Sequence, residues 1–169
     1  GGSSVGSQGV TATWWVDGST RHERGYYVGL NGKLYELAII NNGTGTWTEI
    51  GPPTGETLTG RLTAFPAMYS SQRYVIVFAT TSDGDLYQYS KNITAGTPWS
   101  YTGRGSGYAT NRPLASTVNS DHSILSVFGI KSDYSVTLLR FYSGSWNTYN
   151  LGKPGTGIDV CGSMKRMFI

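Results

Sequence analysis

Residues Glu23–Gly51 read ERGYYVGLNGKLYELAIINNGTGTWTEIG and contain the parts of an antiparallel β unit. An aromatic segment, Gly25–Leu30, leads into the dipeptide Asn31-Gly32, which favours a tight hairpin turn. The segment after the turn, Lys33–Ile40, alternates apolar and polar side chains in the manner of a half-buried strand. A Gly/Asn loop and a short strand beginning near Trp47 complete the unit. We therefore predict a β-hairpin that is extended by a further strand.

The same order of parts returns twice along the chain. Tyr27, Val77 and Val127 lie 50 residues apart each time, and Trp47, Trp99 and Trp146 lie 52 and 47 residues apart. Repeats of about 40–50 residues built from four short strands are typical of propeller blades. We predict a flexible lead over residues 1–9 and a single β domain over 10–169. Its repeats are expected at residues 10–60, 61–112 and 113–157, with a partial repeat at 158–169.

The composition favours an all-β protein. The 169 residues include 24 Gly, 12 Tyr and 5 Trp, and aromatic residues favour strands while Gly and Asn favour tight turns. No segment of ten or more residues has the 3.6-residue apolar period of an amphipathic helix. We predict antiparallel four-stranded repeats in a propeller-like arrangement. The alternative is a single compact β-sheet or sandwich, with one short helix within residues 109–123.

Charge and hydropathy argue against a nucleic-acid partner and against a membrane-spanning helix. The net charge is only +3, and the basic residues are scattered, with Lys165 and Arg166 the only adjacent pair. Proteins that bind nucleic acid usually carry a clustered basic stripe, so we expect no nucleic-acid partner. No apolar run approaches the roughly 20 residues that a membrane-spanning helix needs, so we expect no membrane span. The single cysteine, Cys161, cannot form a disulfide within the chain.

Arg24-Gly25-Tyr26, Leu30-Asn31-Gly32-Lys33, Leu34-Tyr35-Glu36 and Trp47 together resemble the repeat of the fungal fucose-binding lectins, which are six-bladed propellers. The third cycle, SVFGIKSDYSVTLLRFYSGSW, resembles the blades of bacterial propeller lectins. The resemblance implies that Arg24 and Glu36 hydrogen-bond a sugar and that Trp47 packs on its apolar face. It also implies a ligand that is a glycan, fucosylated or galactose-containing.

The other two cycles depart from that pattern. The position of Arg24 becomes Ile76 and then Ser126, and the position of Glu36 becomes Gln88 and then Leu138. We therefore expect only the first cycle to keep a sugar site. Propellers typically have four to eight blades, whereas the chain holds three repeats and a fraction. Closure would need self-association into a homo-oligomer or a longer protein; otherwise the fold is not a propeller.

The residue types of the first cycle suit a sugar site on chemical grounds as well. Arginine offers a planar fork of donors, and a carboxylate accepts hydrogen bonds on both oxygens. Arg24 and Glu36 flank one tight turn, so their side chains can converge on antiparallel neighbours. The competing interpretation is an ion pair on a solvated face. The candidate ligand-binding residues are Arg24, Glu36, Trp47, Tyr26, Tyr35 and Trp15.

We predict a non-catalytic, lectin-like domain without cofactor or metal, located outside the cell or exposed at a surface. The alternative is the glycan-recognising head of a viral spike or cell-surface protein, acting in host cell attachment from a virion surface. A glycoside hydrolase is a weaker alternative, because it needs two facing carboxylates and only Glu36 and Glu49 suggest themselves. Asp121-His122-Ser123 has the residue types of a hydrolase triad, but adjacency in a loop does not position a base against a nucleophile.

Overall fold

The computed structural model describes residues 7–153, which form twelve strands and no helix. The strands are β1 (Ser7–Asp17), β2 (Thr20–Gly29), β3 (Leu34–Ile40), β4 (Thr46–Glu49), β5 (Leu58–Tyr69), β6 (Gln72–Thr81), β7 (Leu86–Asn92), β8 (Ser100–Gly103), β9 (Ala115–Val118), β10 (Leu125–Ile130), β11 (Val136–Tyr142) and β12 (Ser145–Gly152). The first strand begins at Ser7, within the flexible lead that we predicted over residues 1–9. The predicted partial repeat at residues 158–169 and Cys161 lie outside the described residues.

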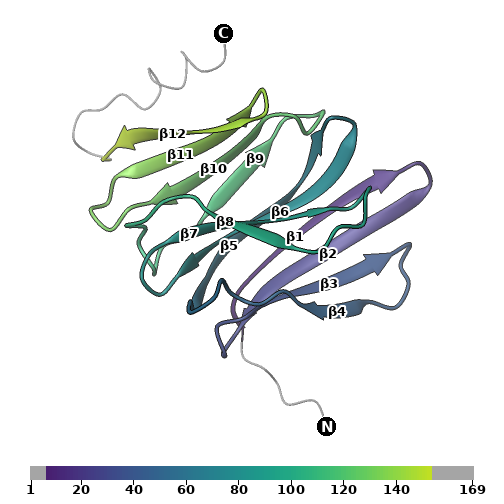
Figure 1. Cartoon of the computed structure of the whole chain (residues 1–169), viewed down its shortest axis with the longest axis horizontal. Coiled ribbons are helices and arrows are strands. Elements are labelled where there is room, and N and C mark those ends of the chain that lie inside the picture. Colours follow the sequence, from purple (N-terminus) through teal and green to yellow (C-terminus); the bar gives the residue numbers. More distant parts are fainter. Residues whose placement is uncertain (1–6, 154–169) are drawn as a thin grey trace.

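The strands form three four-stranded antiparallel sheets, each a meander in chain order: β1–β4 (sheet 1), β5–β8 (sheet 2) and β9–β12 (sheet 3). Figure 1 shows the sheets following one another from purple through teal to green. Strand β1 packs beside β5, and β5 packs beside β9. The prediction of four-stranded, propeller-like repeats is confirmed. The alternative of one sheet or sandwich with a helix at residues 109–123 is wrong for the described chain.

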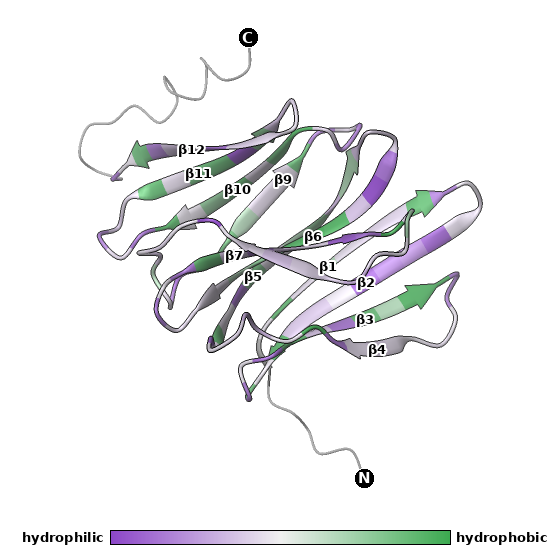
Figure 2. Cartoon of the chain, viewed as in Figure 1, coloured by the Kyte–Doolittle hydropathy of each residue, from purple (hydrophilic) through white to green (hydrophobic). Residues whose placement is uncertain are grey.

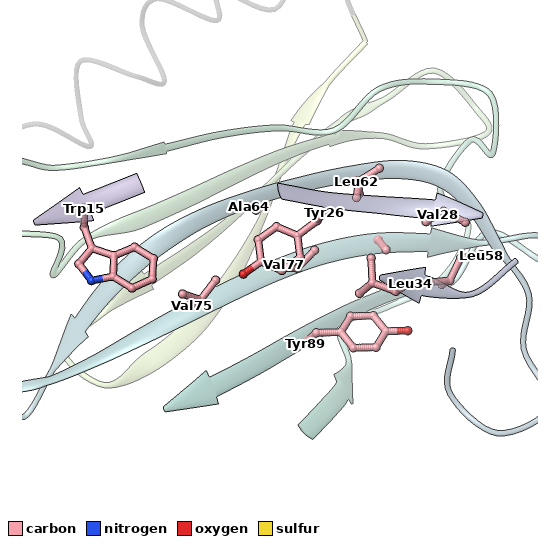
Figure 3. Packing of buried hydrophobic residues seen from close by; sticks show 11 residues of the cluster. Trp15, Tyr26, Val28, Leu34, Leu58, Leu62, Ala64, Val75, Val77 and Tyr89 are labelled. Atoms are coloured by element: carbon pink, nitrogen blue, oxygen red, sulfur yellow. The ribbon is translucent and has the colours of Figure 1, made fainter. Parts of the chain in front are cut away.

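Sheets 1 and 2 pack face to face over a first apolar cluster, which Figure 3 shows from close by. Successive side chains of a strand point to opposite faces, so Tyr26 and Val28 of β2 face sheet 2 while Tyr27 faces away. A second cluster, which includes Phe65, Phe78 and Leu139, joins sheets 2 and 3. Sheet 2 therefore buries both of its faces. This explains why β6 reads as the nearly continuous apolar run RYVIVFATT.

The turns between the second and third strands of the sheets share one geometry. Gly32 and Gly84 stand at the same position with positive φ angles of 72° and 83°, and Tyr134 takes that position in sheet 3 with a φ of 67°. Glycine adopts this left-handed conformation without steric cost. The carbonyls of Gly32 and Gly84 accept backbone hydrogen bonds from Leu58 (3.1 Å) and Tyr108 (2.9 Å). The turns of sheets 1 and 2 thus tie their sheets to the chain entering the next sheet.

The strand register aligns the three sheets residue by residue. Tyr26 pairs with Glu36, Phe78 with Gln88, and Phe128 with Leu138. By the same register Trp47 matches Tyr101 and Thr148. Trp47 pairs with Leu37, Tyr101 with Tyr89 and Thr148 with Leu139, and these three partners occupy one register position. Trp99 and Trp146 precede that position by two residues, where sheet 1 has Gly45. Our alignment of all three tryptophans was therefore wrong for Trp47.

Candidate functional site

Arg24 and Glu36 form a buried ion pair where sheet 1 meets sheet 2, a contact that we call the first junction. Arg24 lies on β2 and Glu36 on β3, and both point toward sheet 2. Arg24 Nε lies 3.3 Å from Glu36 Oε1, and the two residues are only 8% and 2% exposed. The interpretation of an ion pair on a solvated face is therefore wrong. A charged pair held between two sheets needs further polar partners to offset its desolvation.

Two neighbours supply part of that compensation. The Tyr26 hydroxyl donates a hydrogen bond of 3.0 Å to Glu36 Oε1. Burial, together with the adjacent Glu36 carboxylate, raises the pKa of Tyr26 far above its ordinary value, so the hydroxyl stays protonated and keeps donating. Lys91 of sheet 2 brings its Nζ to 3.8 Å from Glu36 Oε2. Lys91 therefore adds positive charge at a distance too long for a hydrogen bond.

Aromatic rings enclose the pair from both sheets. The Trp99 ring of sheet 2 meets Tyr26 edge-on, with 5.9 Å between centroids, and the Lys91 Nζ lies 5.9 Å from the Trp99 ring centroid. The Arg24 guanidinium lies 5.3 Å from the ring centroid of Trp15. Trp99 is half-buried, which leaves part of its ring open. The first junction thus combines a guanidinium, a carboxylate and a partly open indole.

The structure brings together four of the six predicted ligand-binding residues. Arg24, Glu36, Tyr26 and Trp15 share the face of sheet 1 that meets sheet 2. Trp47 and Tyr35 lie on the opposite face, where both rings contact Tyr27. Trp47 is 59% exposed, and Tyr35 donates to Glu49 over 3.3 Å. Sequence reasoning missed Trp99, because it looked for the aromatic within one repeat and the next repeat supplies it.

The first junction also holds polar atoms that lack a hydrogen-bond partner. Among the described residues, these buried atoms are Arg24 Nε, Trp99 Nε1, Tyr89 Oη and His22 Nδ1. The Arg24 Nε is close to Glu36 but does not have hydrogen-bond geometry toward it. Each buried polar group without a partner costs free energy unless a ligand or water satisfies it. Four such atoms lie at this one contact between sheets, so the first junction has unused hydrogen-bonding capacity.

A second polar group closes one end of the first junction. Arg73 of sheet 2 pairs with Asp17 of sheet 1 at 3.0 Å, and Trp15 donates to Asp17 over 2.9 Å. His22 stacks on Trp15 at 4.9 Å between centroids. Burial, followed by the charge of Arg24, lowers the pKa of His22 below its ordinary 6.5. His22 is therefore neutral at pH 7 and can accept or donate without adding charge.

The contact between sheets 2 and 3, which we call the second junction, keeps the tryptophan but not the ion pair. Ile76 replaces the arginine and Gln88 replaces the glutamate. Arg104 reaches in from the residue after β8 and donates to Gln88 Oε1 over 2.8 Å, and its guanidinium lies 5.5 Å from the Trp146 ring centroid. Burial lowers the pKa of Arg104. By register Arg104 matches Ile50 of sheet 1, so arginine and isoleucine have exchanged places between the two junctions.

The hydrolase alternatives lack the necessary geometry. Ser123 donates to Asp121 over 2.6 Å, while the His122 ring nitrogen Nδ1 lies 3.4 Å from Arg73. Glu36 and Glu49 point to opposite faces of sheet 1, so they cannot flank one bond of a substrate. Within residues 7–153, no group of three or more His, Cys, Asp or Glu side chains is arranged so that it could hold a metal ion. That part of the chain also contains no helix long and apolar enough to cross a membrane.

No protein-family model matches the chain, and no curated protein matches it in sequence. Solved structures do match. A fucose lectin from Kordia zhangzhouensis in complex with methyl-fucoside is 22% identical, covers 82% of this chain and 96% of its own, and has a TM-score of 0.60. An Aleuria aurantia lectin with α-methyl-L-fucoside is 21% identical, with coverages of 86% and 49% and a TM-score of 0.63.

AofleA from Arthrobotrys oligospora is 13% identical, with coverages of 85% and 42% and a TM-score of 0.62. Another Aleuria aurantia lectin structure, with a TM-score of 0.52, is described as a six-bladed β-propeller. The match covers 49–50% of the Aleuria lectin in two of its structures and 65–67% in two others. At these identities the likeness shows the fold, and it agrees with the lectin resemblance of the sequence. The three sheets are propeller-type repeats.

Proposed function

We propose that the protein is a non-catalytic, carbohydrate-binding domain and that the first junction holds the sugar. The observation that carries this proposal is the group of Arg24, Glu36 and Trp99, in which buried polar atoms without partners lie beside a partly open indole. The second junction lacks the buried ion pair. The proposal therefore assigns one sugar site to each chain.

The chemistry of a sugar fits the chemistry of this junction. A sugar ring presents hydroxyls at its edges, which both donate and accept hydrogen bonds, and C–H groups on one face. Arg24 Nε and Trp99 Nε1 are donors that lack partners among the described residues, and the Glu36 carboxylate can accept on two oxygens. Hydrogen bonds to charged groups are worth about 1.5–3 kcal/mol each. The open part of the Trp99 ring offers the apolar surface for the C–H face.

We further propose a fucosylated glycan as the ligand. Two of the matching structures contain a methyl-fucoside, and the Arg24, Glu36 and Tyr26 positions carry the resemblance of the sequence to fucose-binding lectins. A galactose-containing glycan is the alternative ligand, and a binding experiment separates the two. Because such glycans are displayed on cell surfaces, we place the domain outside the cell, where attachment to a host surface is one use of the site. The four-stranded repeats favour this lectin assignment over a viral spike head.

The test is a glycan array probed with the purified chain at high multivalency, followed by calorimetry with the sugars that bind. We expect fucosylated glycans to bind and other glycans to bind weakly or not at all. Galactosides binding in preference to fucosides would overturn the ligand assignment. An array without any bound glycan would overturn the function itself.

A further inference from the structure

We propose that the first junction selects glycans in which a neighbouring sugar places an anionic group, a carboxylate or a sulfate, beside the terminal fucose, and that Lys91 binds this group. The selection rests on the proposed function, since it concerns the same site. Lys91 lies on β7, two residues after Tyr89, which packs in the apolar cluster between sheets 1 and 2. Alternate residues of a strand share a face, so Lys91 also faces sheet 1.

The two junctions carry different kinds of side chain at this position. By the register that aligns sheets 2 and 3, Phe141 of β11 occupies the position of Lys91. Phe141 packs on Trp146, with 5.4 Å between the ring centroids. Lys91 instead brings its Nζ to 5.9 Å from the ring centroid of Trp99. The second junction therefore fills the space beside its tryptophan with another ring, whereas the first junction places a cation there.

The backbone beside Lys91 is held by the residue that follows it. The buried Asn92 side chain donates a hydrogen bond of 2.6 Å to Gln72 Oε1 and accepts one of 2.9 Å from the backbone N–H of Ala95. The β7–β8 loop is thereby tied to β6. Lys91 presents its side chain from a fixed backbone, which reduces the ordering that a ligand must impose on the site.

The ammonium of Lys91 has donors to spare. An ammonium carries three donors, and among the described residues Lys91 makes no hydrogen bond, since its Nζ lies 3.8 Å from Glu36 Oε2. The side chain of Lys91 is 30% exposed, whereas Arg24 and Glu36 are buried. Lys91 thus lies at the rim of the first junction, where a group of a bound glycan can reach it.

The contact group of Arg24, Glu36 and Lys91 carries one surplus positive charge. The guanidinium and the ammonium both lie beside the single carboxylate. The adjoining pair of Arg73 and Asp17 is neutral as a whole, so it does not balance the surplus. An anion at Lys91 would balance it, through charge-assisted hydrogen bonds that are roughly twice as strong as neutral ones.

Glu56 lies too far along the junction to supply the missing negative charge. It precedes Leu58, which pairs with Thr81 of β6, whereas Lys91 pairs with Val75. Six residues of a strand span about 20 Å. Figure 2 shows that β2 and β6 begin with hydrophilic residues at the right-hand end of their sheets, which is the end to which Lys91 belongs.

A carboxylate or a sulfate is the ligand group that fits this position. Fucose is neutral, and under the proposed function it lies against Trp99 with its hydroxyls on Arg24 and Glu36. Because Lys91 lies closer to the solvent than that pair, it meets a group on a neighbouring sugar. Lysine acts as a compact point charge without the planar fork of arginine, so the site can take either anion.

The experiment titrates the full chain by calorimetry with three glycans: the neutral Lewis x trisaccharide, a form with sulfate on its galactose, and a form with sialic acid on its galactose. We expect at least one anionic form to bind about 10-fold more tightly than the neutral one, as a hydrogen bond to a charged group allows. Raising the ionic strength from about 0.1 to 1 M shortens the Debye length from about 10 to 3 Å and should remove most of that preference.

Three variants assign the preference to one side chain. Lys91→Met keeps the apolar stem but should bind all three glycans with affinities within about 3-fold of one another, because it lacks the ammonium. Lys91→Arg retains a cation and should retain the preference. Lys33→Met removes an exposed cation that pairs with Glu49 at 2.7 Å in sheet 1, and it should bind as the wild type does.

The outcomes separate this selection from the proposed function. Preference for one anionic form supports the selection and identifies the group that Lys91 binds. Equal binding of the neutral and both anionic forms would overturn the selection and leave the fucose site standing, whereas no binding of any form would overturn the proposed function as well. A uniform loss of affinity in Lys91→Met, for neutral and anionic glycans alike, would mean that Lys91 only supports Glu36 and would also overturn the selection.

Discussion

The two junctions of the chain share a frame but differ in the residues that could bind a ligand. Each has a tryptophan contributed by the following sheet, and each places an aromatic ring, Tyr26 or Phe78, beneath it. The first junction adds a carboxylate and an arginine on β3 and β2, with isoleucine at residue 50. The second has glutamine, and its arginine and isoleucine stand at exchanged positions. The arrangement of strands and aromatic rings that the junctions share is therefore architecture, and under the proposed function the exchanged polar residues distinguish the junction that holds a sugar.

The electrostatics of the junctions follow from this exchange. Arg24 faces a carboxylate, whereas Arg104 faces the neutral amide of Gln88, and burial lowers the pKa of Arg104. In the first junction the Tyr26 hydroxyl donates to Glu36, whereas Phe78 has no hydroxyl. An amide with one committed acceptor and a ring without a hydroxyl give the second junction fewer groups for sugar hydroxyls. The following predictions test this difference, beginning with the largest effect.

Removing both charges of the first junction should have the largest effect on glycan binding. We expect the double variant Arg24→Met/Glu36→Gln to weaken binding by about 100-fold or more, since hydrogen bonds to charged groups contribute about 1.5–3 kcal/mol each. Gln88→Ala in the second junction should leave the affinity unchanged. Calorimetric titration of both variants measures the effect, and equal losses in the two variants would contradict the assignment.

The single variant Arg24→Ala tests the same pair through stability. It leaves Glu36 buried with only Lys91, at 3.8 Å, as a counter-charge, and removing one partner of a buried pair costs about 3–5 kcal/mol. The double variant should lose less, because it removes both charges. Urea denaturation of the two variants measures the free energy of unfolding. A single variant as stable as the wild type would mean that the pair is more solvated than its burial indicates.

The three tryptophans should separate into three behaviours. Trp99→Ala should weaken glycan binding and reduce the free energy of unfolding by about 3 kcal/mol. Trp146→Ala should destabilise by a similar amount with unchanged affinity for each sugar bound. Trp47→Ala, on the exposed face of sheet 1 that points away from sheet 2, should change the stability of the chain by about 0.5 kcal/mol or less. Loss of binding in Trp47→Ala alone would show that Trp47 packs on the apolar face of the sugar, as the sequence resemblance implied.

Transferring the polar residues should convert the second junction into a sugar site. The triple variant Ile76→Arg/Gln88→Glu/Arg104→Ile places the arginine, the glutamate and the isoleucine of the first junction beside Trp146, while Phe78 still lacks the hydroxyl of Tyr26. We expect the stoichiometry to rise from one sugar per chain to two, measured by calorimetry on protein whose thermal unfolding remains cooperative. A folded triple variant that still binds one sugar would show that residues of the first junction other than the three transferred ones are needed for binding.

The smallest effect concerns pH. Burial lowers the pKa values of His22 and His122 in the folded chain, so the unfolded chain takes up protons first as the pH falls through 6.5. The free energy of unfolding should therefore decrease below about pH 6.5. His22→Gln should flatten part of that decrease, and melting temperatures measured between pH 8 and 5 provide the test. A variant with the same pH dependence as the wild type would exclude His22 as a contributor.

The architecture could be predicted from sequence because it rests on local signals. Asn31-Gly32 and Ser82–Asp85 mark turns, alternating and aromatic segments mark strands, and the spacing of the cycles marks the repeat. β5 contains Pro66 and is the first strand of its sheet, an edge position where proline is tolerated. The opposite orientation of Trp14 and Trp15 also follows from strand alternation, and they are 63% and 3% exposed.

The candidate site was harder to predict from the sequence, because it depends on contacts between repeats. Arg24 and Glu36 could be selected from one hairpin, but their burial depends on sheet 2, which no local pattern reveals. Trp99 belongs to the next repeat, and its equivalence to Trp146 rather than Trp47 emerges only from the strand register. The spacing of residues does not reveal the exchange of Arg24 and Ile50 for Ile76 and Arg104 either. Arg24 and Ile50 lie 26 positions apart, whereas Ile76 and Arg104 lie 28 positions apart.

The most direct test of the difference between the junctions is the stoichiometry of methyl-fucoside binding by calorimetry. We predict one sugar per wild-type chain, one per Gln88→Ala chain, and none detectable at the same concentrations for Arg24→Met/Glu36→Gln. Two or more sugars per wild-type chain would contradict the claim that only the first junction binds. Undiminished binding by the double variant would contradict the assignment of the site to Arg24 and Glu36.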